Sequence, residues 1–191
     1  MRVTGGLFCG RKLQTVQAAL LRPTQDRVRE AQFSSLADLL PGGSFLDLYA
    51  GSGSAGIEAW SRGASRVCWV EQDRRVYRVL RENIHNLSKT ETDCTLLPKC
   101  MSVEAFCRRL HAGTFDIVFA DPPYARNGPR AVDVAARLAT SEILKPNGIL
   151  VLEQGSDENV PAGCSGDAWQ LLRERRYGSS LLRYFQKKGV E

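Results

Sequence analysis

Short apolar runs alternate with longer amphipathic segments along most of this chain, and this alternation constrains the fold more than any other feature. The runs that we expect to be strands are 44–50, 66–71, 94–98, 115–120 and 149–154. The segments that we expect to be helices are 22–40 with Thr24 as N-cap, 56–63, 73–87, 103–110 and 131–140, and 145–148 is an expected turn. Repeated strand–helix units of this length build a parallel sheet covered on both faces, with ligand sites at the carboxyl ends of its strands.

Residues 169–186 depart from this rhythm. They predict two strands around a Tyr-Gly-Ser turn, which would add an antiparallel pair to the parallel sheet. A chain of 191 residues accommodates one core, so we expect a single domain over 1–191 that includes a basic N-terminal arm, 1–24. No apolar run approaches the ~18 residues of a membrane span, and the first residues lack the apolar region of a signal peptide. We therefore expect a cytoplasmic protein without a membrane partner.

The charge of the chain is unevenly distributed. Its net charge of +5 arises at the two ends, since 1–30 and 170–191 each hold six basic and two acidic residues, while the intervening part is slightly acidic. Such basic ends suit a polyanion, although they could also only keep the surface hydrated. The six cysteines form no CxxC pair and only two histidines are present, so we expect reduced thiols, with Cys68 buried in a strand, and no metal.

A glycine-rich loop follows the first expected strand. Gly51, Gly53 and Gly56 match the pattern G-x-G-x-x-G between a strand and a helix, and Glu71 ends the next strand 20 positions after Gly51. Small residues let backbone amides approach a nucleotide ligand, and an acidic residue at this spacing can bind ribose hydroxyls. The alternative is that these glycines serve only a tight turn.

Asp47 lies four residues before this loop and helps to distinguish two classes of cofactor. A nicotinamide or flavin dinucleotide would place its pyrophosphate at the start of the following helix, where a carboxylate repels it. The same carboxylate attracts the amino group and sulfonium of S-adenosylmethionine, so Asp47 favours that cofactor. Asp47 could instead only brace the loop as a hydrogen-bond acceptor.

The sequence Asp-Pro-Pro-Tyr at 121–124 follows the strand expected at 115–120. Proline fixes its own φ, donates no amide hydrogen bond and keeps the preceding residue out of the helical region. This stiff step can aim a carboxylate, a carbonyl and an aromatic ring at one small target at little cost in ordering entropy. Its alternative interpretation is an ordinary turn with Tyr124 as a packing residue.

The segments DLYAGSGSAG, VEQD and DPPY, in this order, resemble Rossmann-type S-adenosylmethionine-dependent methyltransferases, particularly those that methylate exocyclic amines. A longer set resembles the RsmD family, which methylates guanine N2 of 16S ribosomal RNA: RVTGG, GRKL, RPTQDRVREAQF, FLDLYAGSGSAGIEAWSRGA, FADPPY, ILKPNGILVLE and RYGSSLLRYF. This resemblance covers nearly the whole chain. It implies a Rossmann-like α/β fold with a mostly parallel seven-stranded sheet, a C-terminal antiparallel pair and helices on both faces.

The resemblance also implies roles for individual residues. Asp47, Gly51 and Gly53 would hold the methionine end of S-adenosylmethionine, and Glu71 its ribose. The full cofactor-binding set is Asp47, Tyr49, Ala50, Gly51, Ser52, Gly53, Glu71, Gln72, Ser102 and Asp121, and the catalytic set is Asp121, Pro122, Pro123 and Tyr124. The RNA-binding candidates are Arg2, Arg11, Arg22, Arg27, Arg29 and Arg126, with Arg130 near the target pocket. Ser102 stands where many members have Asn or Asp, and Ser179 near a common Thr, so these positions depart from the pattern.

The implied substrate is 16S ribosomal RNA within a small-subunit particle or assembly intermediate, methylated by a monomer. The guanine amine is a poor nucleophile because its lone pair is delocalised into the ring. If the Asp121 carboxylate and the Pro122 carbonyl accept its two hydrogens, the nitrogen can point that lone pair at the sulfonium methyl. Tyr124 could then stack on the exposed base.

Other functions remain open at this stage. Asp-Pro-Pro-Tyr also serves adenine N6 and cytosine N4 in DNA, although the sequence holds no separate target-recognition domain. The chain could instead be a non-catalytic RNA-binding module, or an oxidoreductase that binds a dinucleotide. Any single arginine could be an ordinary surface charge, and Arg29 could brace its own helix.

Overall fold

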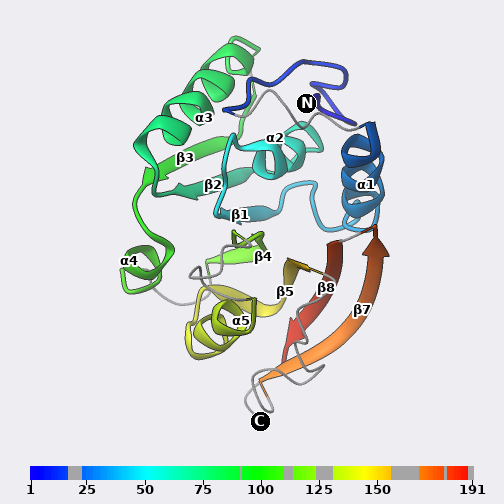
Figure 1. The fold of residues 1–191 in the computed structure, drawn as a ribbon, viewed down its shortest axis with the longest axis vertical. Coiled ribbons are helices and arrows are strands. Elements are labelled where there is room, and N and C mark those ends of the chain that lie inside the picture. Colours follow the sequence, from blue (N-terminus) through cyan, green and yellow to red (C-terminus); the bar gives the residue numbers. More distant parts are fainter. Residues whose placement is uncertain are drawn as a thin grey trace. The chain divides into compact units, whose positions relative to one another are not determined.

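The computed structural model describes residues 1–16, 23–90, 92–109, 114–123, 131–155, 168–178 and 180–188 (Figure 1). The chain divides into two compact units, Met1–Val103 and Glu104–Glu191. Their strands make a seven-stranded, mostly parallel sheet with an antiparallel pair at its C-terminal end, which confirms the predicted α/β class. None of the helices in the described ranges is long and apolar enough to span a membrane.

Three parallel strands form the sheet of the first unit, in the order β3-β2-β1. Strand β1 spans Ser44–Leu48, β2 spans Arg66–Glu71 and β3 spans Thr95–Cys100. All five residues of β1 are buried, as expected of a parallel strand covered on both faces. Since β1 pairs with β2 in parallel, and β2 with β3, their carboxyl ends lie at one edge of the sheet.

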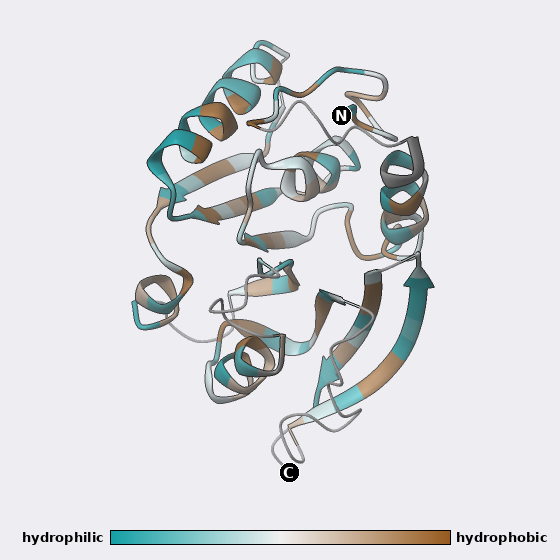
Figure 2. Ribbon diagram, viewed as in Figure 1, coloured by the Kyte–Doolittle hydropathy of each residue, from teal (hydrophilic) through white to brown (hydrophobic). Residues whose placement is uncertain are grey.

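Two helices follow these strands in the first unit. Helix α2 spans Ser54–Ser61 and α3 spans Arg74–Leu87. The carboxylate of Asp73 caps α3 by accepting hydrogen bonds from the backbone N–H groups of Arg75 (2.7 Å) and Val76 (3.2 Å). The buried residues of α3 recur at helical spacing and form one side of the helix, which Figure 2 shows divided into hydrophobic and hydrophilic sides: Leu80, Asn83, Ile84 and Leu87.

The N-terminal arm packs against this unit through apolar side chains. Val3, Phe8 and Leu13 are buried, and the Phe8 ring meets the Trp60 ring edge-on with centroids 4.5 Å apart. Backbone hydrogen bonds close the arm on itself, from Val3 N–H to the Arg11 carbonyl (3.0 Å) and from Leu13 N–H to the Met1 carbonyl (3.0 Å). The described part of the arm, 1–16, therefore has a defined structure in addition to its basic charge.

The first helix is shorter than predicted. Helix α1 spans Pro23–Ser34, so Thr24 lies inside it and is not its N-cap, while the helix expected to reach residue 40 gives way to turns. Proline suits the first helical position because it has no amide hydrogen to satisfy there. At the other end, the Ser35 hydroxyl donates to the Gln32 carbonyl (2.6 Å), a local bond of the kind that competes with the helical ladder.

The second unit carries the remaining strands, in the order β4-β5-β8-β7. Helix α4 (Val103–Cys107) begins at the unit boundary and is followed by β4 (Phe115–Ala120), α5 (Ala131–Thr140), β5 (Leu144–Gly155), β7 (Trp169–Tyr177) and β8 (Ser180–Lys187). Strands β4 and β5 are parallel, whereas β5–β8 and β7–β8 are antiparallel, which confirms the predicted hairpin. The turn expected at 145–148 is instead an irregular start of β5, with Asn147 at a φ of 63° and a register shift against β4.

Candidate functional site

The loop after β1 is held in an unusual backbone conformation. Tyr49, Gly51 and Gly53 have φ values of 59°, 57° and 87°, all in the left-handed region. A side chain in that region costs about 1–2 kcal/mol, a cost that Tyr49 bears and the glycines avoid. Strain of this kind persists where the surrounding structure enforces a particular loop shape, and it is common at functional sites.

The three glycines of the loop serve different purposes. A Cβ on Gly53 would collide with the Leu80 side chain, and a Cβ on Gly56 would collide with the Trp69 indole. These two glycines therefore allow close packing of the loop and of α2 against β2 and α3. A Cβ on Gly51 would meet no atom within 4 Å, so packing does not require glycine there. The space beside Gly51 is where a ligand can approach the backbone.

Asp47 lies beneath this loop and is almost fully buried, with 2% of its surface exposed. Its Oδ2 accepts a hydrogen bond from Gly56 N–H (2.8 Å), in the first turn of α2. Gly53, the N-cap of α2, has no side chain to offer, so Asp47 serves as the cap from outside the helix. The loop-bracing role left open from the sequence is thus present.

The same burial alters the acidity of Asp47. Desolvation raises the pKa of its carboxyl from 3.8 to about 8, the hydrogen bond from Gly56 opposes this, and the negative charge of Glu71 adds to it. A carboxyl with this pKa is largely protonated near neutral pH. A cationic group placed beside Asp47 would favour its ionised form, because opposite charges attract strongly at a desolvated site.

Glu71 lies at the end of β2 and contacts the glycine loop directly. Its Oε2 accepts from Gly51 N–H (2.9 Å), and its Oε1 accepts from Asp73 N–H (2.8 Å). The 20-residue spacing seen in the sequence is therefore a direct contact in space. Glu71 is half-buried, and each carboxylate oxygen has a second lone pair, so Glu71 can also accept from ribose hydroxyls.

The other predicted cofactor residues of the first unit lie at the ends of the same strands. Tyr49, Ser52 and Ser102 are half-buried, Ala50 is buried and Gln72 is exposed. Ser102 follows β3, where Met101 N–H donates to the Glu71 carbonyl (3.1 Å). The structure thus brings the loops after β1, β2 and β3 to one edge of this sheet.

Asn83 belongs to this site and was missed by the sequence analysis. It is 2% exposed, and its Nδ2 donates to the Ser52 carbonyl in the loop (2.9 Å) and to the Gln14 carbonyl in the arm (3.0 Å). Its Oδ1 accepts from Gln14 N–H (2.8 Å). One side chain of α3 therefore ties the N-terminal arm to the glycine loop. Only its place on the apolar side of α3 could have indicated this role.

The second unit places the Asp-Pro-Pro step directly after β4. Asp121 and Pro123 are exposed, while Pro122 is buried. The Asp121 carboxylate therefore lies at a carboxyl end of a parallel strand and is accessible to a ligand. Tyr124, the last residue of the predicted catalytic set, lies outside the described residues.

The RNA-binding candidates differ from one another. Arg2 has 67% of its side chain exposed and pairs with Asp26 (3.3 Å), and Arg11 is also exposed. The predictions for Arg22, Arg126 and Arg130 lie outside the described residues, as does the side chain of Arg27.

Arg29 requires a correction. It is 7% exposed, and its guanidinium contacts the carboxylates of Asp26 (2.7 Å) and Glu58 (3.6 Å). Glu58 is fully buried and also accepts hydrogen bonds from Arg62 (2.9 Å) and from both the amide and the hydroxyl of Thr4 (2.8 and 2.7 Å). Arg29 is thus a buried structural residue that links α1 to α2 and is not available to a phosphate.

The polar groups at the loop fit S-adenosylmethionine better than a dinucleotide. Two carboxyls, Asp47 and Glu71, lie at the loop, and the Gly56 amide that could bind a phosphate already donates to Asp47. A pyrophosphate would meet the Glu71 carboxylate here, whereas an ammonium would favour the ionised form of Asp47 and ribose hydroxyls would find an acceptor in Glu71. Within the described ranges, no group of three or more His, Cys, Asp or Glu side chains could hold a metal ion.

The chain is similar to known proteins over most of its length. The model of the family described as "Conserved hypothetical protein 95" matches residues 1–186. A Haemophilus influenzae protein named ribosomal RNA small subunit methyltransferase D is 33% identical over 186 residues, covering 97% of this chain and 93% of that protein. The solved structure of Escherichia coli yhhF superposes with a TM-score of 0.81 at 28% identity, covering 98% of each chain.

A more distant solved structure shares the fold alone. It is the Thermus thermophilus 16S rRNA N2 G1207 methyltransferase RsmC in complex with AdoMet and guanosine. Its TM-score is 0.67 at 21% identity, and the match covers 91% of this chain and 45% of that one.

Proposed function

Since this chain belongs to the "Conserved hypothetical protein 95" family, together with relatives named ribosomal RNA small subunit methyltransferase D, we propose that it methylates the N2 amine of a guanine in small-subunit ribosomal RNA. This is a family of S-adenosylmethionine-dependent rRNA methyltransferases, so the cofactor is S-adenosylmethionine and the reaction is methyl transfer to rRNA. The choice of guanine N2 is the specific part of the proposal. It is supported by the Asp-Pro-Pro-Tyr sequence and by a structural neighbour that was solved with guanosine.

One observation carries the cofactor site. The Glu71 carboxylate accepts from the Gly51 amide beside open space, and Asp47 is buried under the same loop, where it accepts from the Gly56 amide. We assign Asp47, Gly51 and Gly53 to the methionine end and Glu71 to the ribose. Tyr49, Ala50, Ser52, Gln72 and Ser102 complete the proposed cofactor set of the first unit.

The Asp-Pro-Pro-Tyr segment, residues 121–124, carries out the methyl transfer. S-adenosylmethionine, when bound, supplies a methyl group on a positively charged sulfur. The exposed Asp121 carboxylate and the Pro122 carbonyl accept the two hydrogens of the guanine amine, which frees the nitrogen lone pair for attack. Tyr124 stacks on the base, and Pro123 stiffens the step. Positioning and electrostatic complementarity of this kind account for most of the acceleration.

The proposal extends to the setting in which the protein works. The substrate is 16S ribosomal RNA in a small-subunit particle or assembly intermediate, located in the cytoplasm, and the enzyme acts as a monomer. Both units belong to one methyltransferase domain, because the family match runs through both of them. Arg2 and Arg11, which are exposed, together with Arg22, Arg27 and Arg126, contact RNA phosphates.

The test is methyl transfer from labelled S-adenosylmethionine to unmodified small-subunit particles, naked 16S RNA and duplex DNA, followed by nucleoside analysis. We expect N2-methylguanosine from the ribosomal substrates and no label in DNA. Label in adenine or cytosine of DNA would replace the guanine assignment with the alternative amine targets. Cofactor binding without transfer to any of these substrates would contradict the proposal.

A further inference from the structure

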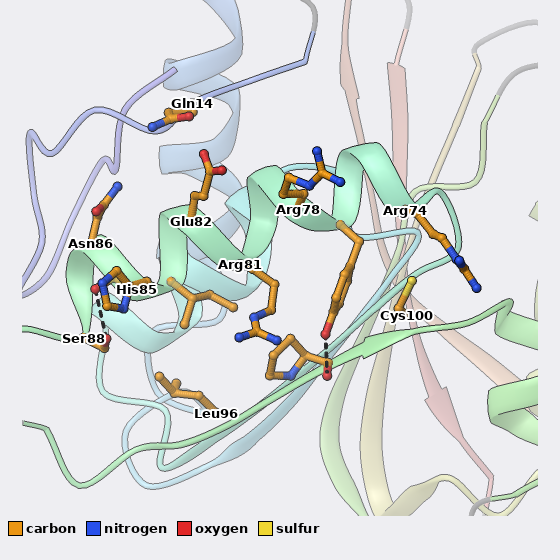
Figure 3. Close-up of a pocket in the computed structure, with 13 residues that line it drawn as sticks. Gln14, Arg74, Arg78, Arg81, Glu82, His85, Asn86, Ser88, Leu96 and Cys100 are labelled. Atoms are coloured by element: carbon orange, nitrogen blue, oxygen red, sulfur yellow. Dashed lines mark hydrogen bonds between the residues drawn. The ribbon is translucent and has the colours of Figure 1, made fainter.

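An open groove of about 1110 Å³ lies between α3 and β3, on the first unit (Figure 3). One wall is a side of α3 that carries exposed side chains together with the buried Ile84. The floor is the half-buried part of β3, which ends the strand order β3-β2-β1.

Three arginines of α3 line the groove in a row. Arg74, Arg78 and Arg81 stand at i, i+4 and i+7, which places them on one side of the helix, and all three are exposed. The row extends about 10 Å along the helix axis. A row of this length exceeds the size of one phosphate and suits a chain of phosphates.

These arginines differ from the arginines that stabilise the fold. Arg29 and Arg62 pair with the buried carboxylate of Glu58. Within the described part of the chain, none of the three groove arginines forms an ion pair, although Glu82 also lines the groove. Their charge is therefore not used internally and is available to a ligand.

The floor of the groove is apolar. Leu96 and Pro98, at alternate positions of β3, form this floor, and both are half-buried. Tyr77 stands over the floor with its hydroxyl donating to the Pro98 carbonyl (3.3 Å). This bond orients the Tyr77 ring within the groove, which both Tyr77 and Pro98 line. The groove thus combines a row of cations with an aromatic ring and an apolar surface.

We propose that this groove binds a single-stranded segment of the RNA substrate. The proposal rests on the proposed function, because it takes RNA as the substrate. Proteins that hold single strands combine positive charge that follows the backbone with rings and apolar surfaces against which bases pack, and the groove offers both. Guanidinium groups also match phosphate geometry. An acidic protein segment would use the arginines but would gain little from the ring and the floor, so RNA is the occupant.

The first test compares two double variants of α3 and its C-terminal end. Arg78→Ala with Arg81→Ala removes two groove charges, while Arg75→Ala with Lys89→Ala removes two exposed charges that do not line the groove. Both variants lose the same net charge, so any general electrostatic attraction to RNA falls equally. The affinity for a naked 16S RNA fragment is measured between 50 and 200 mM salt.

We expect the groove variant to lose about 1.4 from the slope of log affinity against log salt, at about 0.7 per single-strand phosphate contact. Between 50 and 200 mM salt, the factor by which the RNA affinity falls should then be about seven times smaller for the groove variant than for the native protein. The control variant should keep the native slope. Equal slopes for the two variants would overturn the proposal, and so would a groove defect seen only with assembled particles, which would indicate a protein partner.

A second measurement uses Cys100, an exposed free thiol that lines the groove. Bound RNA should slow its alkylation by a maleimide in the native protein and in the control variant, and much less in the groove variant, as read by peptide mass spectrometry. An alkylation rate that RNA leaves unchanged in the native protein would overturn the proposal. Absence of methyl transfer by the native protein would instead overturn the proposed function, so the two failures are distinguishable.

Discussion

Asn83 connects the N-terminal arm to the glycine loop, and its removal should affect both. Asn83→Ala deletes the bonds to Gln14 N–H, the Gln14 carbonyl and the Ser52 carbonyl, all made by a side chain that is 2% exposed. At a net value of about 1 kcal/mol for each bond, the free energy of unfolding should fall by about 3 kcal/mol. For a chain of this size, that corresponds to a decrease of about 6–12 °C in the unfolding midpoint.

The assay is urea and thermal unfolding of the native protein, Asn83→Ala and the matched control Asn86→Ala. Asn86 lies on the same helix but is exposed, so its loss should change stability by less than about 0.5 kcal/mol. Asn83→Asp should be at least as destabilising as Asn83→Ala, because an acceptor would then face two carbonyl oxygens. Cofactor affinity should also weaken in both Asn83 variants, since the loop loses its bond at Ser52. The reasoning is refuted if Asn83→Ala is as stable as Asn86→Ala.

Three further predictions follow from the same contacts. Gly51 and Gly178 have nearly equal φ values, 57° and 59°, and a Cβ on either would lie in open space, so Gly51→Ala and Gly178→Ala should each lower stability by about 1–2 kcal/mol. Only Gly51→Ala should also weaken the binding of S-adenosylmethionine. If both variants bind the cofactor equally well, Gly51 does not belong to the cofactor site. The pKa of Asp47 is about 8 in the folded protein, above its ordinary value of 3.8, so folding takes up a proton between these two pH values. As pH rises from 4 to 8, the stability of the native protein should therefore fall relative to that of Asp47→Asn, by at most about 1.4 kcal/mol per pH unit. Parallel stability–pH profiles for the two proteins would contradict this. Arg29→Met leaves the buried Glu58 carboxylate without one of its cationic partners, so the free energy of unfolding should fall by about 3 kcal/mol. The salt dependence of RNA binding should stay unchanged. A shallower salt dependence would indicate that Arg29 contacts a phosphate.

Patterns that depend on local spacing predicted several local contacts and strand ends. The 20 residues between Gly51 and Glu71 became a hydrogen bond because parallel strand pairing brings the ends of β1 and β2 together. The step at Asp121 follows a strand as expected, since proline excludes a helical continuation. The hairpin of β7 and β8 was evident from its turn and flanking strands.

Features set by tertiary contacts were not predictable from one sequence. In the sequence Arg29 resembles the other arginines near the N-terminus, whereas in the structure it is buried against Glu58 of α2 and Asp26. The end of α1 was overestimated because Leu36 and Leu40 are buried but belong to turns, and burial alone does not distinguish a helix from turns. The groove arginines were overlooked because the middle of the chain is slightly acidic in total, whereas three of the four arginines of α3 line one groove.

The central claim is that the loop beside Asp47 binds the cofactor while the Asp-Pro-Pro-Tyr step performs the transfer. The measurement that tests it most directly is the single-turnover rate of methyl transfer to 16S RNA in Asp121→Ala, taken together with the dissociation constant for S-adenosylmethionine. The account predicts that the transfer rate falls at least about 100-fold while cofactor affinity stays near the native value. Transfer at the native rate would contradict it and would remove Asp121 from the mechanism.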